Sequence, residues 1–312
     1  MRVLLTGGSS FTGCWFAAAL ADAGCEVIAT CRRPLDDYTG IAARRLALAR
    51  RAGCALFGAL AFGEPRFVRL VATARIDLLC HHGAAIGDFR SPGFDPLACH
   101  DAATAGADAV MAALARGGGR ALVLTGSVFE GAGTAAAKPV LAYGRAKAQI
   151  RATLTAAAAR HVLASACFVV PHPIGALEKP GLGTYLSTRW LAGQPARLRH
   201  PTLVRDFIHV DLLAALYAEF CGAQLRAGAP RLRAPSGRAA TLLEQARWLA
   251  AALSPRLGVP CAVLGAEPPE PSDEPERLVN PEEAGARAAT WPVEEAWDRL
   301  ADFYLWLNSS TA

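Results

Sequence analysis

The chain has 312 residues, of which 53% are hydrophobic and 19% are charged, and its formal net charge is +5. This composition predicts a folded protein with a large buried core and argues against a disordered chain. No apolar run approaches the ~20 residues that span a bilayer. The first 14 residues lack a basic and apolar leader, so we expect a cytoplasmic protein with no membrane partner. The arginines are scattered, which indicates no nucleic-acid partner and weakly favours a small anionic substrate.

Nine cysteines are distributed along the chain. Their odd number and the lack of CxxC or Cys/His ligand spacing predict reduced thiols in the core. The adjacent His81 and His82 invite a metal interpretation, but neighbours on a strand point to opposite faces and no carboxylate cluster accompanies them. We therefore expect no metal site.

Short apolar runs alternate with helical stretches through the first 170 residues. This alternation predicts a parallel α/β sheet with helices on both faces and with ligands bound at the carboxyl ends of the strands. The expected strands are Arg2 to Thr6, Glu26 to Thr30, Ala55 to Phe57, Ile76 to His81, Ala121 to Thr125 and Val162 to Val170.

The turn between the first strand and the helix expected over Phe11 to Ala23 is rich in glycine. Gly7 can adopt the positive φ of a tight turn, and Gly13 allows the helix to pack close to the strand. The helix N-terminus then offers backbone N–H groups to a dinucleotide diphosphate, although a plain strand-to-helix connection is the alternative. The expected cofactor-binding residues of this turn are Gly7, Gly8, Ser9, Ser10, Phe11, Thr12 and Gly13.

The second strand leads into Cys31-Arg32-Arg33, where an NAD-selecting protein would carry a carboxylate for the ribose 2′-hydroxyl. A guanidinium at this position suits a 2′-phosphate, because it can donate paired, charge-assisted hydrogen bonds. We therefore expect NADP as the cofactor, with Arg32 as a contact, while NAD is possible and an exposed basic turn is the alternative.

Tyr143 and Lys147 lie four residues apart at the start of an expected helix, so they share one face. The lysine ammonium and a bound nicotinamide cation would stabilise the tyrosinate and lower the pKa of Tyr143 from near 10. Tyr143 could then exchange a proton with a carbinol oxygen. An exposed helix start with a solvated lysine is the alternative.

The segment Thr6-Gly7-x-x-Ser10-x-x-Gly13 resembles the TGxxGxxG turn of the extended short-chain dehydrogenase/reductases. This family contains sugar-nucleotide epimerases, dehydratases and ketoreductases. Ser10 stands where the family usually has its middle glycine, so either its φ is negative or the diphosphate lies farther out.

The resemblance implies catalytic roles for Tyr143 and Lys147, both of which would also contact the cofactor. Aligning residues 128–129 with the family's Val-Tyr puts Thr125 in the position of the hydroxyl that holds the substrate oxygen. Ser127 is the second choice, because the register at a strand end is uncertain by a residue or two. A helix-capping hydroxyl is the alternative.

Two further segments carry the resemblance into the second half of the chain. Residues 205–211 resemble the family's Arg-Asp-Phe-Ile-His-Val-x-Asp segment, which implies that Arg205 contacts the diphosphate of a nucleotide-sugar. An ordinary salt bridge of Arg205 is the alternative. His172 replaces the asparagine of the family's substrate loop and is expected to act as an acid/base, to bind substrate or to be a satisfied loop histidine.

Together these features predict an α/β fold with a Rossmann-type doubly wound parallel sheet and a smaller mixed C-terminal substrate domain. We expect a dinucleotide-binding domain over residues 1–170, with a helix near 206–221 packing back on it, and a substrate-binding cap over residues 171–312. A homodimer is possible.

The resemblance implies an NAD(P)-dependent epimerase or ketoreductase acting on a nucleotide-activated sugar or a related carbonyl. Gly126 and Ser127 stand where 4,6-dehydratases carry two acids, which argues against dehydration. The apparent arginine-for-carboxylate exchange slightly favours a reductase. The alternative is a catalytically silent Rossmann protein that binds NADP(H) as a redox sensor or partner-binding module.

Overall fold

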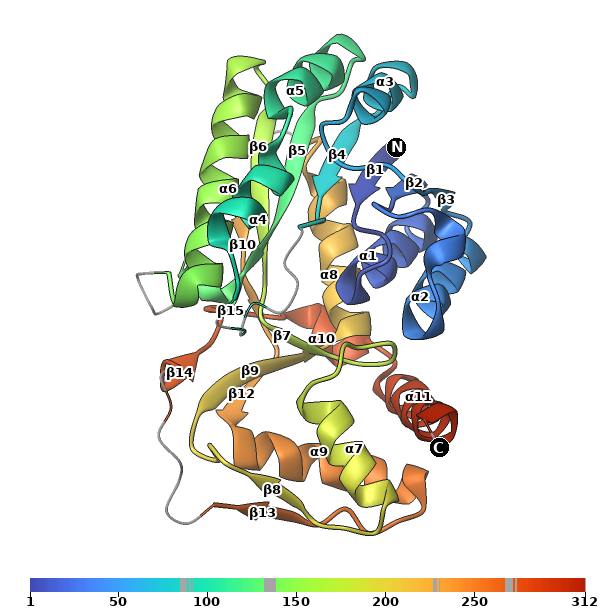
Figure 1. The fold of residues 1–312 in the computed structure, drawn as a ribbon, viewed down its shortest axis with the longest axis vertical. Coiled ribbons are helices and arrows are strands. Elements are labelled where there is room, and N and C mark those ends of the chain that lie inside the picture. The colour runs from blue at the N-terminus through green and yellow to red at the C-terminus, as the bar shows by residue number, and fades with distance from the viewer. Residues whose placement is uncertain are drawn as a thin grey trace. The chain divides into compact units, whose positions relative to one another are not determined.

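The computed structural model divides into two compact units. The first contains Met1–Val170 and Ala214–Ala234, and the second contains Pro171–Leu213 and Pro235–Ala312 (Figure 1). None of the described helices has the length and apolarity needed to cross a bilayer. The structure describes residues 1–84, 89, 91, 93–131, 139–226, 229, 231–266, 272 and 274–311.

A seven-stranded parallel sheet forms the centre of the first unit. Strand order reverses beside β1, which creates the switch point at which doubly wound sheets bind ligands. The expected Rossmann-type sheet is therefore confirmed. In spatial order the strands are β10 (Leu232–Arg233), β6 (Ala164–Val170), β5 (Ala121–Ser127), β4 (Leu78–His81), β1 (Arg2–Thr6), β2 (Glu26–Thr30) and β3 (Ala55–Phe57).

Helices cover both faces of this sheet (Figure 1). On one face, Leu4 and Leu122 of the sheet join Phe67 of α3 and Leu154 of α6 in one buried apolar cluster. The helices of this unit are α1 (Phe11–Asp22), α2 (Gly40–Arg51), α3 (Pro65–Thr73), α4 (Pro96–Thr104), α5 (Ala107–Arg116), α6 (Leu141–Arg160) and part of α8 (Val210–Ala223), together with the short 3-10 helices η1 (Leu35–Asp37) and η2 (Val128–Glu130).

The opposite face of the sheet packs on α1 and α8. Phe16 of α1 stacks on Tyr217 of α8 with ring centroids 4.0 Å apart, and Phe168 of β6 meets Tyr217 edge-on at 5.2 Å. These rings are all fully buried. The helix expected to begin near residue 206 begins at Val210, because the alternating residues before it form strand β9.

The second unit is a mixed α/β structure with several small sheets. Its largest sheet has β9 (Val204–His209) paired in parallel with β7 (His172–Ile174) and β14 (Arg277–Leu278), and antiparallel with β12 (Arg238–Thr241). The remaining elements are β8 (Ala196–Leu198), β11 (Pro235–Ser236), β13 (Val263–Gly265), β15 (Glu282–Glu283), α7 (Leu182–Leu191), α9 (Leu242–Leu257), α10 (Ala286–Thr290) and α11 (Val293–Thr311).

A buried carboxylate links α7 and α11 within the second unit. Glu178 lies in the loop before α7, and its Oε1 accepts hydrogen bonds from the Tyr304 phenol at 2.8 Å and from the Thr184 hydroxyl at 3.3 Å. Gly183 is required beside this contact, since a Cβ there would lie 2.1 Å from the Tyr304 oxygen. Burial raises the pKa of Glu178 to about 7, despite these hydrogen bonds.

Candidate active site

The glycine turn after β1 is closed against two other strand ends. Gly7 has φ +80°, and the N–H groups of Gly7 and Gly8 both donate to the Thr30 oxygen at the end of β2. A Cβ at Gly7 would lie 2.8 Å from the Gly83 Cα, and a Cβ at Gly13 would lie 2.2 Å from the Gly7 oxygen. Glycine is therefore needed here both for its backbone angle and for close approach.

Ser10 has φ −79°, which is the negative value that one of the two expectations required. Its Oγ caps α1 by accepting the Gly13 N–H at 3.1 Å. The Nε2 atom of His82 lies 3.0 Å from Ser10 Oγ and 3.1 Å from Thr12 Oγ1. His82 follows β4 and was not selected from the sequence as a site residue, because its contact with the turn spans 72 residues.

The turn and helix fit the diphosphate of a dinucleotide. The first N–H groups of a helix have no acceptor within the helix, so those of Phe11 and Thr12 are available at the start of the 12-residue α1. The helix dipole adds a partial positive charge at the same end. Ser9 of this turn lies near the Cys31 thiol and lowers its pKa, whereas burial raises it.

The end of β2 presents two exposed arginines, Arg32 and Arg33. Arg32 is exposed, whereas Cys31 is buried. Arg33 is engaged by Tyr38, because its guanidinium carbon lies 4.3 Å from the centre of that ring. Ala59, in the turn after β3, adopts φ +49°. These positions fit a 2′-phosphate contact through Arg32.

Tyr143 lies in the first turn of α6 within an aromatic environment. Its ring stacks on Phe89 with centroids 4.5 Å apart and meets Phe129 edge-on at 5.8 Å. Burial raises the pKa of Tyr143, although a hydrogen bond with Ser127 acts in the opposite direction. Desolvation therefore outweighs the favourable interaction with Ser127, and the expected lowering of the pKa, which invoked a bound nicotinamide cation, stays a prediction.

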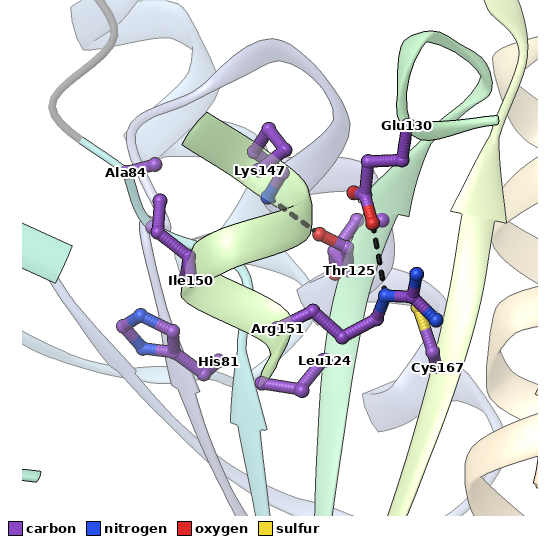
Figure 2. Close-up of a pocket in the computed structure, with 11 residues that line it drawn as sticks. His81, Ala84, Leu124, Thr125, Glu130, Lys147, Ile150, Arg151 and Cys167 are labelled. Atoms are coloured by element: carbon purple, nitrogen blue, oxygen red, sulfur yellow. Dashed lines mark hydrogen bonds and ion pairs between the residues drawn. The ribbon is translucent and has the colours of Figure 1, made fainter. Parts of the chain in front are cut away.

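Lys147 is buried one helical turn after Tyr143, and its Nζ donates a 2.7 Å hydrogen bond to the backbone oxygen of Thr125. The bond is shown in Figure 2, where Lys147 lies beside a narrow pocket between β5 and α6. The lining residues are His81, Gly83, Ala84, Leu124, Thr125, Gly126, Glu130, Lys147, Ile150, Arg151 and Cys167.

The two candidate hydroxyls at the end of β5 face different tyrosines. The Thr125 hydroxyl faces the Tyr217 phenol of α8, whereas the Ser127 hydroxyl faces the Tyr143 phenol of α6 and lowers its pKa. The alternation of β5 turns Thr125 toward α8, and the strand ends at Ser127, where η2 begins. This arrangement differs from the alignment that put Thr125 first, since it joins Ser127 to Tyr143.

Two charged residues that line the pocket, Glu130 and Arg151, were not selected from the sequence. Glu130 ends η2 with its side chain fully buried, and its Oε2 lies 3.1 Å from Nε of Arg151 on α6 (Figure 2). Burial and then the charge of Lys147 lower the pKa of His81 to about 3, so His81 is neutral. The sequence signal that could have identified Arg151 is its i, i+4 spacing from Lys147, which places both side chains on one face of α6.

The two expected substrate residues both lie in the second unit. His172 begins β7, and its ring stacks on Phe207 of β9 with centroids 6.2 Å apart. Arg205 is buried in β9, where its Nη2 forms a 2.8 Å ion pair with Glu274 and its Nη1 donates to the oxygens of Val204 and Pro275. Arg205 therefore forms a salt bridge in this structure, which was the alternative expectation for this residue.

The family model of the NAD dependent epimerase/dehydratase family matches residues 3–224. The chain belongs to this family. The matched range contains the glycine turn, Tyr143, Lys147, His172 and Arg205. No curated protein matches the chain significantly.

Solved structures share the fold of this epimerase/dehydratase family member over its whole length. A UDP-glucose-4-epimerase from Stenotrophomonas maltophila with bound NAD and formylated UDP-arabinopyranose is 22% identical, with a TM-score of 0.73 and 100% coverage of both chains. A UDP-N-acetylglucosamine 4-epimerase from Methanobrevibacter ruminantium M1 in complex with UDP-N-acetylmuramic acid is 14% identical, with a TM-score of 0.75 and 98% coverage of both chains.

Proposed function

We propose that the protein is an NAD(P)-dependent oxidoreductase or epimerase that acts on a nucleotide-activated sugar or a related carbonyl. The observation that carries this proposal is that the Ser127 hydroxyl at the carboxyl end of β5 faces the Tyr143 phenol, with Lys147 one turn farther along α6. The UDP-sugar complexes of structurally similar proteins support the substrate class. Family membership supports the nicotinamide cofactor.

In the proposed reaction, Tyr143 exchanges the proton of a substrate hydroxyl or carbonyl oxygen. Ser127 donates a hydrogen bond to the same oxygen, and Lys147 holds the cofactor ribose and contributes positive charge that favours the tyrosinate. The bound nicotinamide supplies the acceptor or donor of hydride at the carbinol carbon. The aromatic rings around Tyr143 exclude water from the phenol.

The proposed cofactor is NADP(H), with NAD(H) as the alternative. Exposed Arg32 at the end of β2 supports a 2′-phosphate contact, while no carboxylate follows this strand directly. A ketoreductase oxidises NADPH and must then release NADP⁺, so easy exchange of the cofactor would suit a ketoreductase. An epimerase must retain the cofactor through both half-reactions.

A catalytically silent dinucleotide-binding protein is the second candidate. The raised pKa of Tyr143 favours this candidate, because a phenol that resists ionisation is a poor base. The presence of Tyr143, Ser127 and Lys147 together in the first unit favours the first candidate, the enzyme.

The test combines binding and turnover. Purified protein is titrated with NADPH and NADH by fluorescence, and then incubated with UDP-sugars and their 4-keto derivatives in the presence of each cofactor. Interconversion of epimers without net cofactor consumption identifies an epimerase, and stoichiometric oxidation of NADPH identifies a reductase. Cofactor binding with no turnover across the panel would favour the silent protein.

A further inference from the structure

Glu130 is a buried carboxylate that belongs to none of the roles described above. It ends η2, the single 3-10 turn that follows β5, and its side chain has no exposed surface. A buried charge is costly unless it is paired and hydrogen-bonded, so its presence requires specific partners. Its Oε1 accepts the Ser127 N–H at 2.9 Å, and its Oε2 pairs with Arg151 at 3.1 Å.

The backbone around Glu130 is closely packed. A Cβ at Gly126 would lie 3.2 Å from Glu130 Oε1, and a Cβ at Gly144 would lie 2.0 Å from the Phe129 oxygen. The start of α6 is therefore in direct contact with η2. Glu130 thus connects β5, η2 and α6, the elements that carry Ser127, Tyr143 and Lys147.

The hydrogen bonds of η2 orient the Ser127 hydroxyl. Ser127 Oγ accepts the Phe129 N–H at 3.4 Å while Glu130 holds the Ser127 N–H, which is a reciprocal capping arrangement. Because Ser127 Oγ already accepts from the backbone, its own hydrogen can point to the Tyr143 oxygen. Loss of the Glu130 carboxylate would release the backbone of Ser127.

The charge of Glu130 acts on the same phenol. A negative charge near a phenol opposes its ionisation, and the Glu130 carboxylate raises the pKa of Tyr143 beyond the effect of burial. Burial raises the pKa of Glu130, and the positive charges of Lys147 and Arg151, which face it from α6, act in the opposite direction.

We infer that Glu130 is a positioning residue for the Tyr143–Ser127 pair, which it orients through the Ser127 backbone and whose working pH it sets through its charge. The inference rests on the proposed function for its kinetic consequences. Its geometric part does not depend on that function.

Two substitutions separate the geometric and electrostatic effects. Glu130→Gln keeps an acceptor for the Ser127 N–H but removes the charge, whereas Glu130→Ala removes both. With an accepted substrate in the oxidative direction, Glu130→Gln should move the rising limb of the kcat–pH profile to lower pH by roughly one unit. Glu130→Ala should lower kcat by about tenfold or more with KM within about threefold, since orientation and not substrate binding is lost.

Asp108→Asn is the matched control, because it also turns a carboxylate into an amide but lies exposed at the start of α5. Its pH profile should coincide with that of the unmodified protein. A stability role alone would lower Tm in the Glu130 variants and leave the pH profile of Glu130→Gln unchanged, and this result would overturn the inference.

A second measurement needs no substrate. In protein labelled at tyrosine Cζ with ¹³C, the resonance missing from Tyr143→Phe is that of Tyr143. Both Ser127→Ala and Glu130→Ala should move this resonance in the same direction, because one removes the Ser127 hydroxyl that faces the phenol and the other releases the backbone that orients it. An unmoved resonance in folded Glu130→Ala would refute the positioning role. Absent turnover of the unmodified protein with every nucleotide-sugar would refute only the proposed function.

Discussion

The imidazole Nε2 of His82 lies 3.0 Å from Oγ of Ser10, across the glycine turn that follows β1. Ser10 occupies the position at which the family resemblance leads us to expect glycine, and its hydroxyl also caps α1 through Gly13. A side chain at this position would point freely toward a bound diphosphate if nothing held it. The His82 imidazole and the Gly13 N–H therefore both hold the Ser10 hydroxyl in the turn.

This pairing predicts a double-mutant cycle in cofactor affinity. In the protein with Ser10, His82→Ala should weaken NADPH binding by about three- to tenfold, since about one hydrogen bond of ~1 kcal/mol is lost. In the Ser10→Gly background the same substitution should change the Kd by less than about twofold. Fluorescence titration measures all four values, and equal effects of His82→Ala in both backgrounds would show that the two residues act independently.

Arg32 is predicted to select NADP over NAD. Arg32→Ala should weaken NADPH binding by roughly 1.5 to 3 kcal/mol, because a charge-assisted contact to the 2′-phosphate is lost, and should leave NADH binding nearly unchanged. Arg33→Ala is the matched control, because Arg33 stacks on Tyr38. Isothermal titration measures both cofactors. Tighter binding of NAD than of NADP by the unmodified protein would contradict the assignment.

Tyr143→Phe should preserve the fold and cofactor binding but reduce turnover by about two to four orders of magnitude. The aromatic contacts with Phe89 and Phe129 involve the ring, which phenylalanine retains. Circular dichroism, cofactor titration and steady-state kinetics check the three parts. Near-normal turnover of this variant would remove Tyr143 from the mechanism and favour the silent protein.

Arg205→Ala should destabilise the second unit. Arg205 is 3% exposed, and removal of one partner from a buried ion pair costs about 3–5 kcal/mol. Glu274→Gln is the companion variant and should cost less, because the Glu274 side chain retains 24% exposure. Urea denaturation measures both losses.

A direct diphosphate contact would give Arg205→Ala a different signature. The KM for a nucleotide-sugar would then rise by about 10- to 100-fold while the KM for a neutral ketone stayed constant. This result, with unchanged stability, would rule out the purely structural assignment.

The protein should lose stability as pH rises from about 4.5 to about 7 because of Glu178. In this range the folded state keeps the Glu178 proton while the unfolded state, with the ordinary pKa of 4.5, releases it. Stability falls with pH wherever the folded state binds more protons, and the loss is on the order of 3 kcal/mol, complete above pH ~7.

Glu178→Gln should flatten this pH dependence, because glutamine can accept the Tyr304 hydrogen bond without becoming charged. Asp302→Asn, which changes an exposed carboxyl on α11, should leave the dependence intact. Urea denaturation between pH 5 and pH 8 measures the three proteins. An equally steep curve for Glu178→Gln would place the titrating group elsewhere.

The sequence alone determined the features that depend on neighbouring residues. Strands β1, β2 and β3 have the expected bounds, because each is an apolar run between turn-forming residues. The positive φ of Gly7 follows from local steric preference, whereas the sequence left two possibilities for Ser10 and the structure shows a negative φ. Likewise, the shared helix of Tyr143 and Lys147 follows from the alanine-rich segment around them.

Tertiary structure decided which of these groups meet and in what electrostatic environment. Thr125 and Ser127 are equivalent hydroxyls in the sequence, but the packing of α8 and α6 gives them different tyrosine partners. The partners of Ser10 and Arg205 lie 72 and 69 residues away along the chain. Such pairings, and the burial that raises the pKa of Tyr143, depend on contacts between distant segments. Local preferences do not encode these contacts, because desolvation and charge pairing arise only when the chain has folded.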